Sequence, residues 1–233
     1  MSGRCIMMCA GDFHPMEIDA QKDDFVIAVD GGLKFLMEAG IEPDLLLGDF
    51  DSLEGEFTET IEMYRARGEE HFLQLPVVKN DTDTMAAARI GIRKGYREFL
   101  IYGGTGGRPD HFMANIQTMN WIQRNGGQAF MLDREARMTV IGPGIFRIPD
   151  GFDGTVSMFA LDRRLEGVTI RGMKYCLENA TVTNDYPVGI SNETLPRGED
   201  PGAAGKEPEE AFYSIGEGTA LLIMTEKLIN RHH

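Results

Sequence analysis

Short apolar runs alternate with helix-like segments over residues 4–133, and this alternation constrains the fold more than any other feature of the sequence. The runs are nearly continuous, as in strands that are buried on both faces of a parallel sheet. They span residues 4–10, 25–29, 44–47, 72–75, 99–102 and 128–132. We therefore predict an α/β unit with a Rossmann-like, mostly parallel sheet and helices on both faces.

The segments between these runs carry helix signals. Apolar residues recur there at spacings of three and four, which is typical of a helix face that packs on a sheet. Gly40, Gly95 and Gly126 follow three such segments, at the position where a helix often ends in a left-handed residue. Asp110 stands where we expect the N-cap of a further helix.

After about residue 140 the rhythm of the sequence changes. Short runs that often alternate between apolar and polar residues are separated by Gly, Pro and Asp, with no convincing helix among them. They span residues 145–148, 155–161, 167–170, 180–183, 212–215 and 220–224. This pattern predicts an all-β sandwich or small barrel. We expect residues 1–141 to form the α/β domain and residues 142–233 to form the β-sandwich domain.

The composition excludes some partners. The 233 residues include 37 acidic and 23 basic ones, which gives a formal net charge of -14. Such a chain repels nucleic acid and an anionic membrane surface, so we predict neither as a partner. No stretch approaches the ~20 apolar residues of a membrane span. Three cysteines, at positions 5, 9 and 176, form no paired motif, which favours a reducing, cytoplasmic location.

Acidic residues follow the predicted strands, at the sheet edge where open α/β folds bind ligands. Asp49 and Asp51 lie two residues apart in the segment GDFDS, and Asp83 stands at the start of a later predicted helix. Mg²⁺ takes carboxylate oxygens together with substrate phosphates, so these three acids predict a magnesium site that holds a polyphosphate. Taken alone, the Asp49–Asp51 pair is explained better by an ordinary turn.

A glycine-rich loop, GGTGGRPDH at residues 103–111, follows the fifth predicted strand. Glycine lets a backbone approach a ligand closely, and Arg108 is suited to clamp phosphate oxygens. Asp110 is suited to hold that arginine or a ribose hydroxyl, although a purely structural Arg–Asp pair explains the same residues equally well. We expect His111 to line the site. No GxxxxGK[ST] motif occurs in the sequence, which excludes a P-loop enzyme.

Three segments, taken in order, closely resemble the nucleotide-binding half of thiamine pyrophosphokinases. They are VDGGLKFLMEAGIEPDLLLGDFDSL, KNDTDTMAAARIGIRKG and YGGTGGRPDHFMANIQTM, and the resemblance continues more faintly in GMKYCLENATV and GISNETL. It implies an N-terminal α/β domain that binds ATP, and a C-terminal β-sandwich that contributes to thiamine binding and dimerisation. It also implies a homodimer with active sites between subunits, and transfer of pyrophosphate from ATP to thiamine with release of AMP.

The resemblance also implies roles for individual residues. Asp49, Asp51 and Asp83 match the acids around magnesium, and with Arg108 they form the predicted catalytic set. The residues expected around the nucleotide are Asp30, Gly31, Gly32, Arg108, Asp110 and His111. Ser191 and Asn192 match a motif that lies near thiamine.

Two questions stay open at this level. Trp121 lies within a predicted helix, which leaves Tyr186 and Phe212 as candidate rings beside thiamine. The same acids would also serve another magnesium-dependent phosphotransferase or nucleotide hydrolase, because a fold alone does not fix the acceptor. A non-catalytic nucleotide or thiamine sensor is the third alternative.

Overall fold

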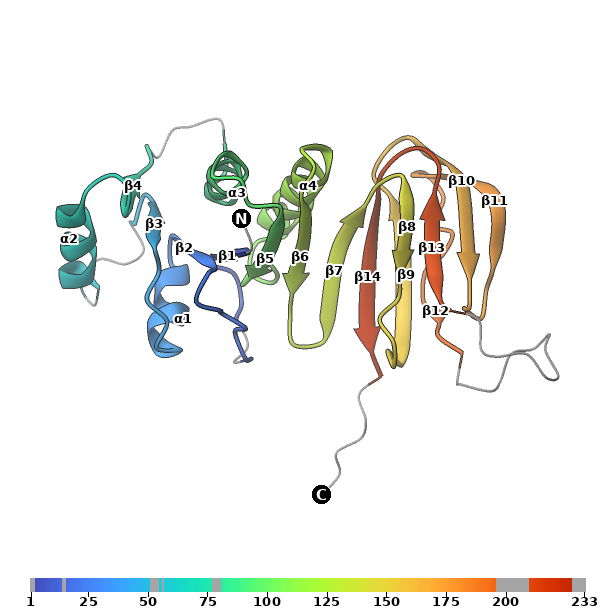
Figure 1. Cartoon of the computed structure of the whole chain (residues 1–233), viewed down its shortest axis with the longest axis horizontal. Coiled ribbons are helices and arrows are strands. Elements are labelled where there is room, and N and C mark those ends of the chain that lie inside the picture. Colours follow the sequence, from blue (N-terminus) through green and yellow to red (C-terminus); the bar gives the residue numbers. More distant parts are fainter. Residues whose placement is uncertain are drawn as a thin grey trace, which may run out of the picture. The chain divides into compact units, whose positions relative to one another are not determined.

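The structure is a computed structural model that describes residues 3–13, 16–50, 55, 57–76, 81–195 and 210–227 (Figure 1). Contacts between Cα atoms divide the chain into two compact units, Met1–Arg134 and Glu135–His233. The sequence-based boundary between residues 141 and 142 falls at the end of strand β7 (Ala136–Ile141), whereas the division by contacts falls just before that strand.

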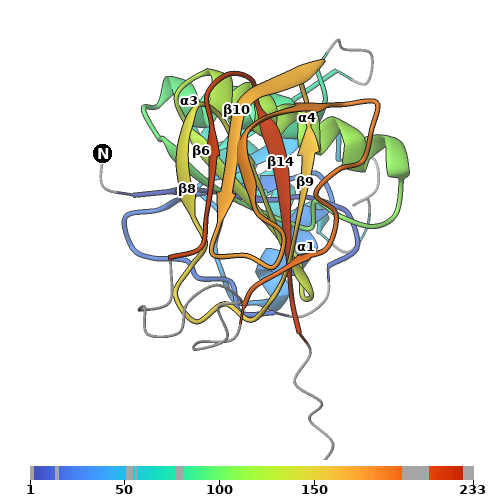
Figure 2. The same ribbon diagram turned by 90° about the vertical axis from the view of Figure 1, so that its right-hand side faces the viewer.

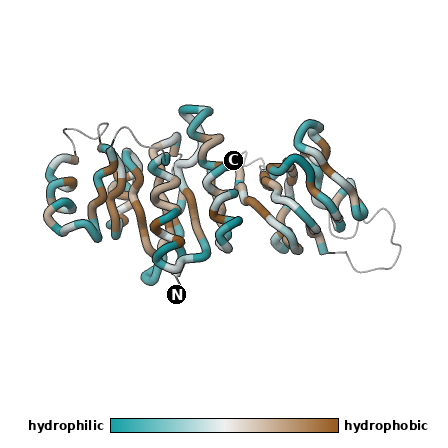
Figure 3. Tube along the Cα trace, turned by 90° about the horizontal axis from the view of Figure 1, so that it is seen from above, coloured by the Kyte–Doolittle hydropathy of each residue, from teal (hydrophilic) through white to brown (hydrophobic). Residues whose placement is uncertain are grey.

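Six strands of the N-terminal unit pair side by side, and every pairing among them is parallel. They follow the order β4-β3-β2-β1-β5-β6. Their bounds are β1 (Cys5–Met8), β2 (Phe25–Val29), β3 (Leu45–Gly48), β4 (Phe72–Gln74), β5 (Glu98–Tyr102) and β6 (Gln128–Leu132). All six strands were predicted from the apolar runs. Brown segments of the tube in Figure 3 mark hydrophobic stretches of the chain. Chain order reverses at β1, whose two neighbours are β2 and β5.

Among the residues that the structure describes, four helices accompany these strands: α1 (Gly32–Glu38), α2 (Thr58–Arg67), α3 (Asp83–Arg93) and α4 (Pro109–Arg124). Gly40, Gly95 and Gly126 have φ angles of 69°, 96° and 76°, so the predicted left-handed residues after α1, α3 and α4 are confirmed. The predicted N-cap at Asp110 is wrong. Arg108 is the N-cap of α4, because Pro109 takes the first helical position, and Asp110 lies in the first turn.

Side chains alternate between the two faces of the parallel strands. Ile6 and Met8 of β1 belong to a buried cluster with Leu33 and Leu36 of α1 and with residues of α2. On the other face, Gly91 of α3 lies so close to Cys5 and Phe99 that an added Cβ would be 2.5 Å from the Phe99 ring and 2.9 Å from the Cys5 sulfur. Each large side chain buried in this way contributes roughly 1.5–3 kcal/mol.

The C-terminal unit contains antiparallel strands only, within residues 135–195 and 210–227, and no helix is present in those ranges. Strands pair in the orders β12-β9-β14-β7 and β11-β10-β13-β8. Besides β7, they are β8 (Gly144–Arg147), β9 (Gly154–Ala160), β10 (Arg164–Arg171), β11 (Leu177–Thr183), β12 (Asn192–Glu193), β13 (Phe212–Ile215) and β14 (Ala220–Glu226). Figure 2 views this unit from another side, with β8, β9, β10 and β14 labelled.

One buried cluster draws on both sets of strands in this unit. It joins Val156 and Met158 of β9 and Leu222 of β14 to Val168 of β10 and Tyr213 of β13. Strands from two sets that share one core form a sandwich-like arrangement. Strands β7 and β12 were not predicted from the sequence.

Candidate active site

Several chemically important residues lie at one edge of the N-terminal unit. Because its strands are parallel, the segments that follow them emerge at the same edge, where ligands bind in open α/β folds. Asp30 follows β2, Asp49 follows β3, and Asp12 and the glycine-rich loop follow β1 and β5. Asp83 opens α3, whose preceding residue Thr82 caps the helix by accepting a hydrogen bond from the Met85 amide at 3.2 Å.

Asp30 is the centre of this group. It adopts a left-handed backbone conformation with φ of 49°, and α1 begins directly after it. The backbone amide of Asp49 donates a hydrogen bond to Asp30 Oδ1 at 3.0 Å. Gly48 is required here, because a Cβ at that position would lie 1.8 Å from the same carboxylate oxygen. The absent side chain therefore lets the loops after β2 and β3 meet.

Asp83 is the second acid in contact with Asp30. Burial, together with the negative charge of Asp83, a side-chain hydrogen bond with Asp83 and the charge of Asp49, raises the pKa of Asp30 to about 7. A carboxyl group that is buried among other acids is costly to ionise. The predicted acids Asp49 and Asp83 thus lie beside a third acid, Asp30, that the sequence had suggested only for the nucleotide.

The segment GDFDS is anchored by Phe50. Its ring is 6% exposed and stacks on Phe72 with the ring centroids 5.2 Å apart, while its φ is 61°. A bulky residue rarely adopts that conformation, and such strained residues concentrate at functional sites. Nothing in the sequence signals the strain, because glycine or asparagine would be expected at a left-handed position. Asp51, the next residue, lies outside the described residues.

The described residues do not contain a cluster of three or more His, Cys, Asp or Glu side chains with the geometry of a metal site. Magnesium commonly takes only one or two carboxylates and completes its shell with phosphate oxygens and water. The contact between Asp30 and Asp83 beside Asp49 is compatible with such a site. A bound cation would offset the repulsion between these neighbouring acids.

The glycine-rich loop carries Arg108 at its end. The Arg108 guanidinium forms two hydrogen bonds with Asp110, Nε to Oδ1 at 3.1 Å and Nη2 to Oδ2 at 2.5 Å. This pairing raises the pKa of Arg108 and lowers that of Asp110. His111 donates its backbone amide to Asp110 Oδ1 at 3.1 Å, and its side chain is exposed. Arg108 and Asp110 therefore form the pair that the sequence suggested.

Gly31 and Gly32 open α1 directly after Asp30. Gly31 is the N-cap of the helix, and a Cβ on Gly32 would lie 2.0 Å from the backbone oxygen of Met8. Gly32 thus lets α1 pack closely against the end of β1.

In the C-terminal unit, Ser191 and Asn192 differ in their surroundings. Ser191 is exposed, has φ of 53° and donates its amide to Ser157 Oγ at 3.0 Å. Asn192 is 2% exposed, and its side chain is bonded to the Tyr175 backbone on both sides. Its Oδ1 accepts from the Tyr175 amide at 2.9 Å, and its Nδ2 donates to the Tyr175 oxygen at 2.7 Å.

Tyr175 is a further candidate for the aromatic ring beside thiamine, and the sequence analysis did not identify it. It is 62% exposed although its backbone is held by Asn192, and Lys174 Nζ lies 5.7 Å from its ring centroid. Tyr186 is 69% exposed, and Phe212 is partly buried in β13. The only sequence clue to Tyr175 was its place in the faintly matching GMKYCLENATV segment.

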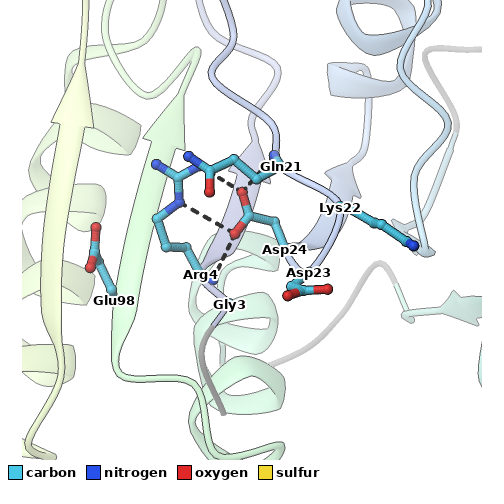
Figure 4. Close-up of a pocket in the computed structure, with 7 residues that line it drawn as sticks. All are labelled: Gly3, Arg4, Gln21, Lys22, Asp23, Asp24 and Glu98. Atoms are coloured by element: carbon cyan, nitrogen blue, oxygen red, sulfur yellow. Dashed lines mark hydrogen bonds and ion pairs between the residues drawn. The ribbon is translucent and has the colours of Figure 1, made fainter.

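A cavity of about 470 Å³ lies at the opposite edge of the N-terminal unit, where β1, β2 and β5 begin (Figure 4). Arg4 Nη2 pairs with Asp24 Oδ2 at 2.7 Å, and Arg4 Nη1 pairs with Asp19 Oδ2 at 2.8 Å. Arg4 therefore offsets the charges of Asp19 and Asp24 at this edge.

Acids at the carboxyl edge of a parallel sheet, with an arginine-bearing glycine loop at the same edge, are typical of enzymes that transfer phosphate groups. Comparison with known proteins shows which family of such enzymes this chain resembles. Residues 19–131 match the family model described as "Thiamin pyrophosphokinase, catalytic domain", and residues 145–200 match "Thiamin pyrophosphokinase, vitamin B1 binding domain".

Individual relatives agree with these matches. The thiamine pyrophosphokinase of Bacillus subtilis (strain 168) is 31% identical over 170 residues, which are 72% of this chain and 78% of the relative. A crystal structure of thiamine pyrophosphokinase from Bacillus subtilis aligns with a TM-score of 0.79 and 26% identity, covering 97% of this chain and all of the other. A thiamin pyrophosphokinase family protein from Enterococcus faecalis aligns with a TM-score of 0.75 and 28% identity, over 96% of this chain and 99% of that one. The chain belongs to the thiamin pyrophosphokinase family.

Proposed function

We propose that this chain transfers a pyrophosphoryl group from ATP to the hydroxyl of thiamine, giving thiamine diphosphate and AMP. The observation that carries the proposal is the meeting of Asp30, Asp49 and Asp83 at the carboxyl edge of the parallel strands. The two substrates are inferred from membership of the family. The group of acids is the proposed binding site for the polyphosphate of ATP. The strand order, which reverses at β1, further supports a Rossmann-like description of this unit.

Asp49, Asp51 and Asp83 would hold Mg²⁺ in this proposal, with Asp30 beside them. When bound, the ion supplies charge that offsets the negative phosphates and the neighbouring carboxylates. The pKa of Asp30, raised to about 7, supports this assignment, because a cation nearby would favour the ionised acids. Asp30 would also orient the loop after β3 through its bond to the Asp49 amide.

The remaining residues of the N-terminal unit would position the nucleotide. Arg108 would exchange one or both of its bonds to Asp110 for bonds to phosphate oxygens, which is feasible because its side chain is 70% exposed. Asp110, His111 and the Gly31–Gly32 turn would line the nucleotide. Phosphoryl transfers need little covalent help from the protein, so placement and charge neutralisation provide most of the catalysis.

Thiamine would contact the C-terminal unit at Ser191 and Tyr175, with Asn192 as a positioning residue. The two bonds from the buried Asn192 amide to the Tyr175 backbone support this division of roles, since they leave the Tyr175 ring exposed. We include in the proposal a homodimer, which the family resemblance suggested, and a cytoplasmic location, which the cysteine content suggested. No helix in the described part of the chain has both the length and the apolar character needed to cross a bilayer.

The test is to incubate the protein with ATP and Mg²⁺, with and without thiamine, and to measure AMP, ADP and thiamine diphosphate. We expect AMP and thiamine diphosphate in equal amounts, and only when thiamine is present. ADP or phosphate as the product would instead support another phosphotransferase or a hydrolase. Nucleotide binding without any product would support a sensor.

A further inference from the structure

We infer that Asp12, which follows β1 and lies outside the three matching segments, is a positioning residue for the glycine-rich loop that carries Arg108. The inference rests on the proposed function, since it assigns that loop to the nucleotide. It concerns contacts between two segments, residues 9–12 after β1 and residues 102–107 at the end of β5 and in the glycine-rich loop.

The pairing of β1 with β5 continues beyond the ends of both strands. The Cys9 amide donates to the Tyr102 oxygen at 2.8 Å, the Gly11 amide to the Gly103 oxygen at 2.9 Å, and the Asp12 amide to the Thr105 oxygen at 3.0 Å. Gly11 permits this close approach, because a Cβ there would lie 2.4 Å from the Thr105 oxygen. The backbone of residues 9–12 therefore fixes the path of the loop up to Thr105.

The Asp12 side chain fixes the next part of the loop. Its Oδ2 accepts a hydrogen bond from the Gly107 amide at 3.0 Å. Gly106 and Gly107 have φ angles of 73° and 60°, which glycine adopts without strain. A Cβ on Gly106 would lie 2.4 Å from the Asp12 carboxylate, so the two residues are packed directly against each other. The Asp12 carboxylate thus holds the turn that immediately precedes Arg108.

Two further side chains hold the start of the loop. Thr105 Oγ1 donates to Asp133 Oδ2 at 2.8 Å, and Asn115 Nδ2 of α4 donates to the Gly104 oxygen at 2.9 Å. Asn115 and Thr105 are 6% and 9% exposed, so these contacts belong to the folded core. Asp12 differs from them because it is exposed and contacts the end of the loop nearest Arg108.

The consequence is a loop whose five glycine and threonine residues are already ordered before a nucleotide binds. A glycine-rich segment loses much conformational entropy when it is ordered, and ordering it in advance lowers that cost at binding. Without the Asp12 carboxylate the Gly106–Gly107 turn loses its side-chain anchor, and Arg108 samples more positions. The loss should weaken the interaction with ATP and leave the interaction with thiamine unchanged.

The experiment compares the full-length wild type with Asp12→Ala, Asp12→Asn and the control Asp23→Ala. Asp23 is exposed and lies two residues before β2, so its removal makes the same charge change at the opposite edge. For each protein we would measure the KM values for ATP and thiamine, kcat, the melting temperature, and the Kd of ATP by calorimetry without thiamine.

For Asp12→Ala we expect the KM and the Kd for ATP to rise on the order of 10-fold, as for the loss of a hydrogen bond to a charged group. The KM for thiamine and the melting temperature should stay near those of the wild type. Asp12→Asn should behave like the wild type, since its amide oxygen still accepts from Gly107, and Asp23→Ala should do the same.

An unchanged or lower Kd for ATP in Asp12→Ala would overturn the inference, because the carboxylate would then be irrelevant to ATP or would compete with it. Equal impairment of Asp12→Asn and Asp12→Ala would also overturn it, since charge and not the hydrogen bond would then be decisive. A wild type that binds ATP but makes no thiamine diphosphate would reject the proposed function alone. The difference in ATP Kd between the wild type and Asp12→Ala would still decide the role of Asp12.

Discussion

Asp30 and Asp83, from the end of β2 and the start of α3, share a side-chain hydrogen bond although both are acids. Asp49 adds a third negative charge beside them and donates its backbone amide to Asp30 at 3.0 Å. If these three acids had no functional role, replacing one of them with a neutral residue would only stabilise the fold. The arrangement therefore makes a direct test of the proposed cation site possible.

Asp30→Asn should stabilise the protein at pH 8 in the presence of a chelator. Asparagine tolerates a φ of 49° and its amide oxygen can still accept the Asp49 amide, while one of three adjacent negative charges is removed. We expect a gain of roughly 1 kcal/mol in the free energy of unfolding, reduced from the Coulomb value by solvent screening. Thermal or urea denaturation measures it.

The same variant should lose the response to magnesium. Added MgCl₂ should raise the melting temperature of the wild type by mass action and that of Asp30→Asn by much less. Turnover should fall by about 100-fold, as for the loss of one charged group at a phosphoryl-transfer site. Glu38→Gln, an exposed change on α1, is the control and should respond to MgCl₂ like the wild type. Equal stabilisation of Asp30→Asn by MgCl₂ would argue against a cation at this site.

Arg108→Ala should reduce kcat/KM for ATP by about 100-fold, because Arg108 is proposed to meet the phosphates. Arg108→Lys should recover only part of this, since lysine keeps the charge but cannot form the two parallel bonds that Arg108 now makes with Asp110. The side chain is 70% exposed, so both variants should unfold within about 0.5 kcal/mol of the wild type. Arg93→Ala, an exposed change in the last turn of α3, is the control. Steady-state kinetics with varied ATP would contradict the role if both variants matched the control.

The strands of the N-terminal unit could be predicted because buried parallel strands need continuous apolar sequence, as in Phe25–Val29. Strand β7 was missed because Ala136–Ile141 begins within a charged segment, DREAR at residues 133–137, without the Gly or Pro that marked other strand starts. The cap at Asp110 was misplaced because proline at the first helical position outweighed the capping preference of aspartate.

The site was harder to predict than the fold. Asp49 and Asp83 could be placed at the carboxyl edge of the sheet, because Asp49 follows a strand and Asp83 begins the helix between two strands. The contact of Asp30 with both depends on Gly48 and on left-handed backbone at Asp30 and Phe50, which the residue types do not specify. Asn192 was expected beside a ligand, but its burial and its bonds to Tyr175 follow from pairing between segments distant in the sequence.

Asp24→Asn should remove an acid-sensitive part of the stability. Burial would raise the pKa of Asp24, but hydrogen bonds from the Arg4 side chain and backbone and from the Gln21 amide lower it overall (Figure 4). A lowered folded-state pKa gives stability that is present above the unfolded-state pKa, near 3.9, and that is lost as the pH falls through the folded-state value. The wild type should therefore exceed Asp24→Asn by roughly 2 kcal/mol at pH 6, and by less at pH 3.

Urea denaturation between pH 3 and pH 7 measures this difference. Asp23→Asn is a matched control. Asp23 is exposed, whereas the side chain of its neighbour Asp24 is only 2% exposed. A gap between the wild type and Asp24→Asn that stays constant over this range would show that the Arg4–Asp24 contact contributes by packing and not by charge.

Asn192→Ala and Tyr175→Ala should affect thiamine alike but stability differently. Both should raise the KM for thiamine on the order of 10-fold, since one removes the ring and the other frees the backbone that holds it. Only Asn192→Ala should lower the free energy of unfolding, by about 1–3 kcal/mol, because it leaves two backbone groups of Tyr175 without their side-chain partner. Tyr175 is 62% exposed, so its truncation should cost little stability.

Tyr186→Ala is the control that separates the candidate rings, since Tyr186 is exposed to a similar extent, at 69%. It should leave the KM for thiamine and the KM for ATP unchanged. A raised thiamine KM in Tyr186→Ala together with a normal one in Tyr175→Ala would assign the aromatic contact to the ring suggested by the sequence. Asn192 would then only stabilise the unit, because its bonds would be holding a residue that thiamine does not touch.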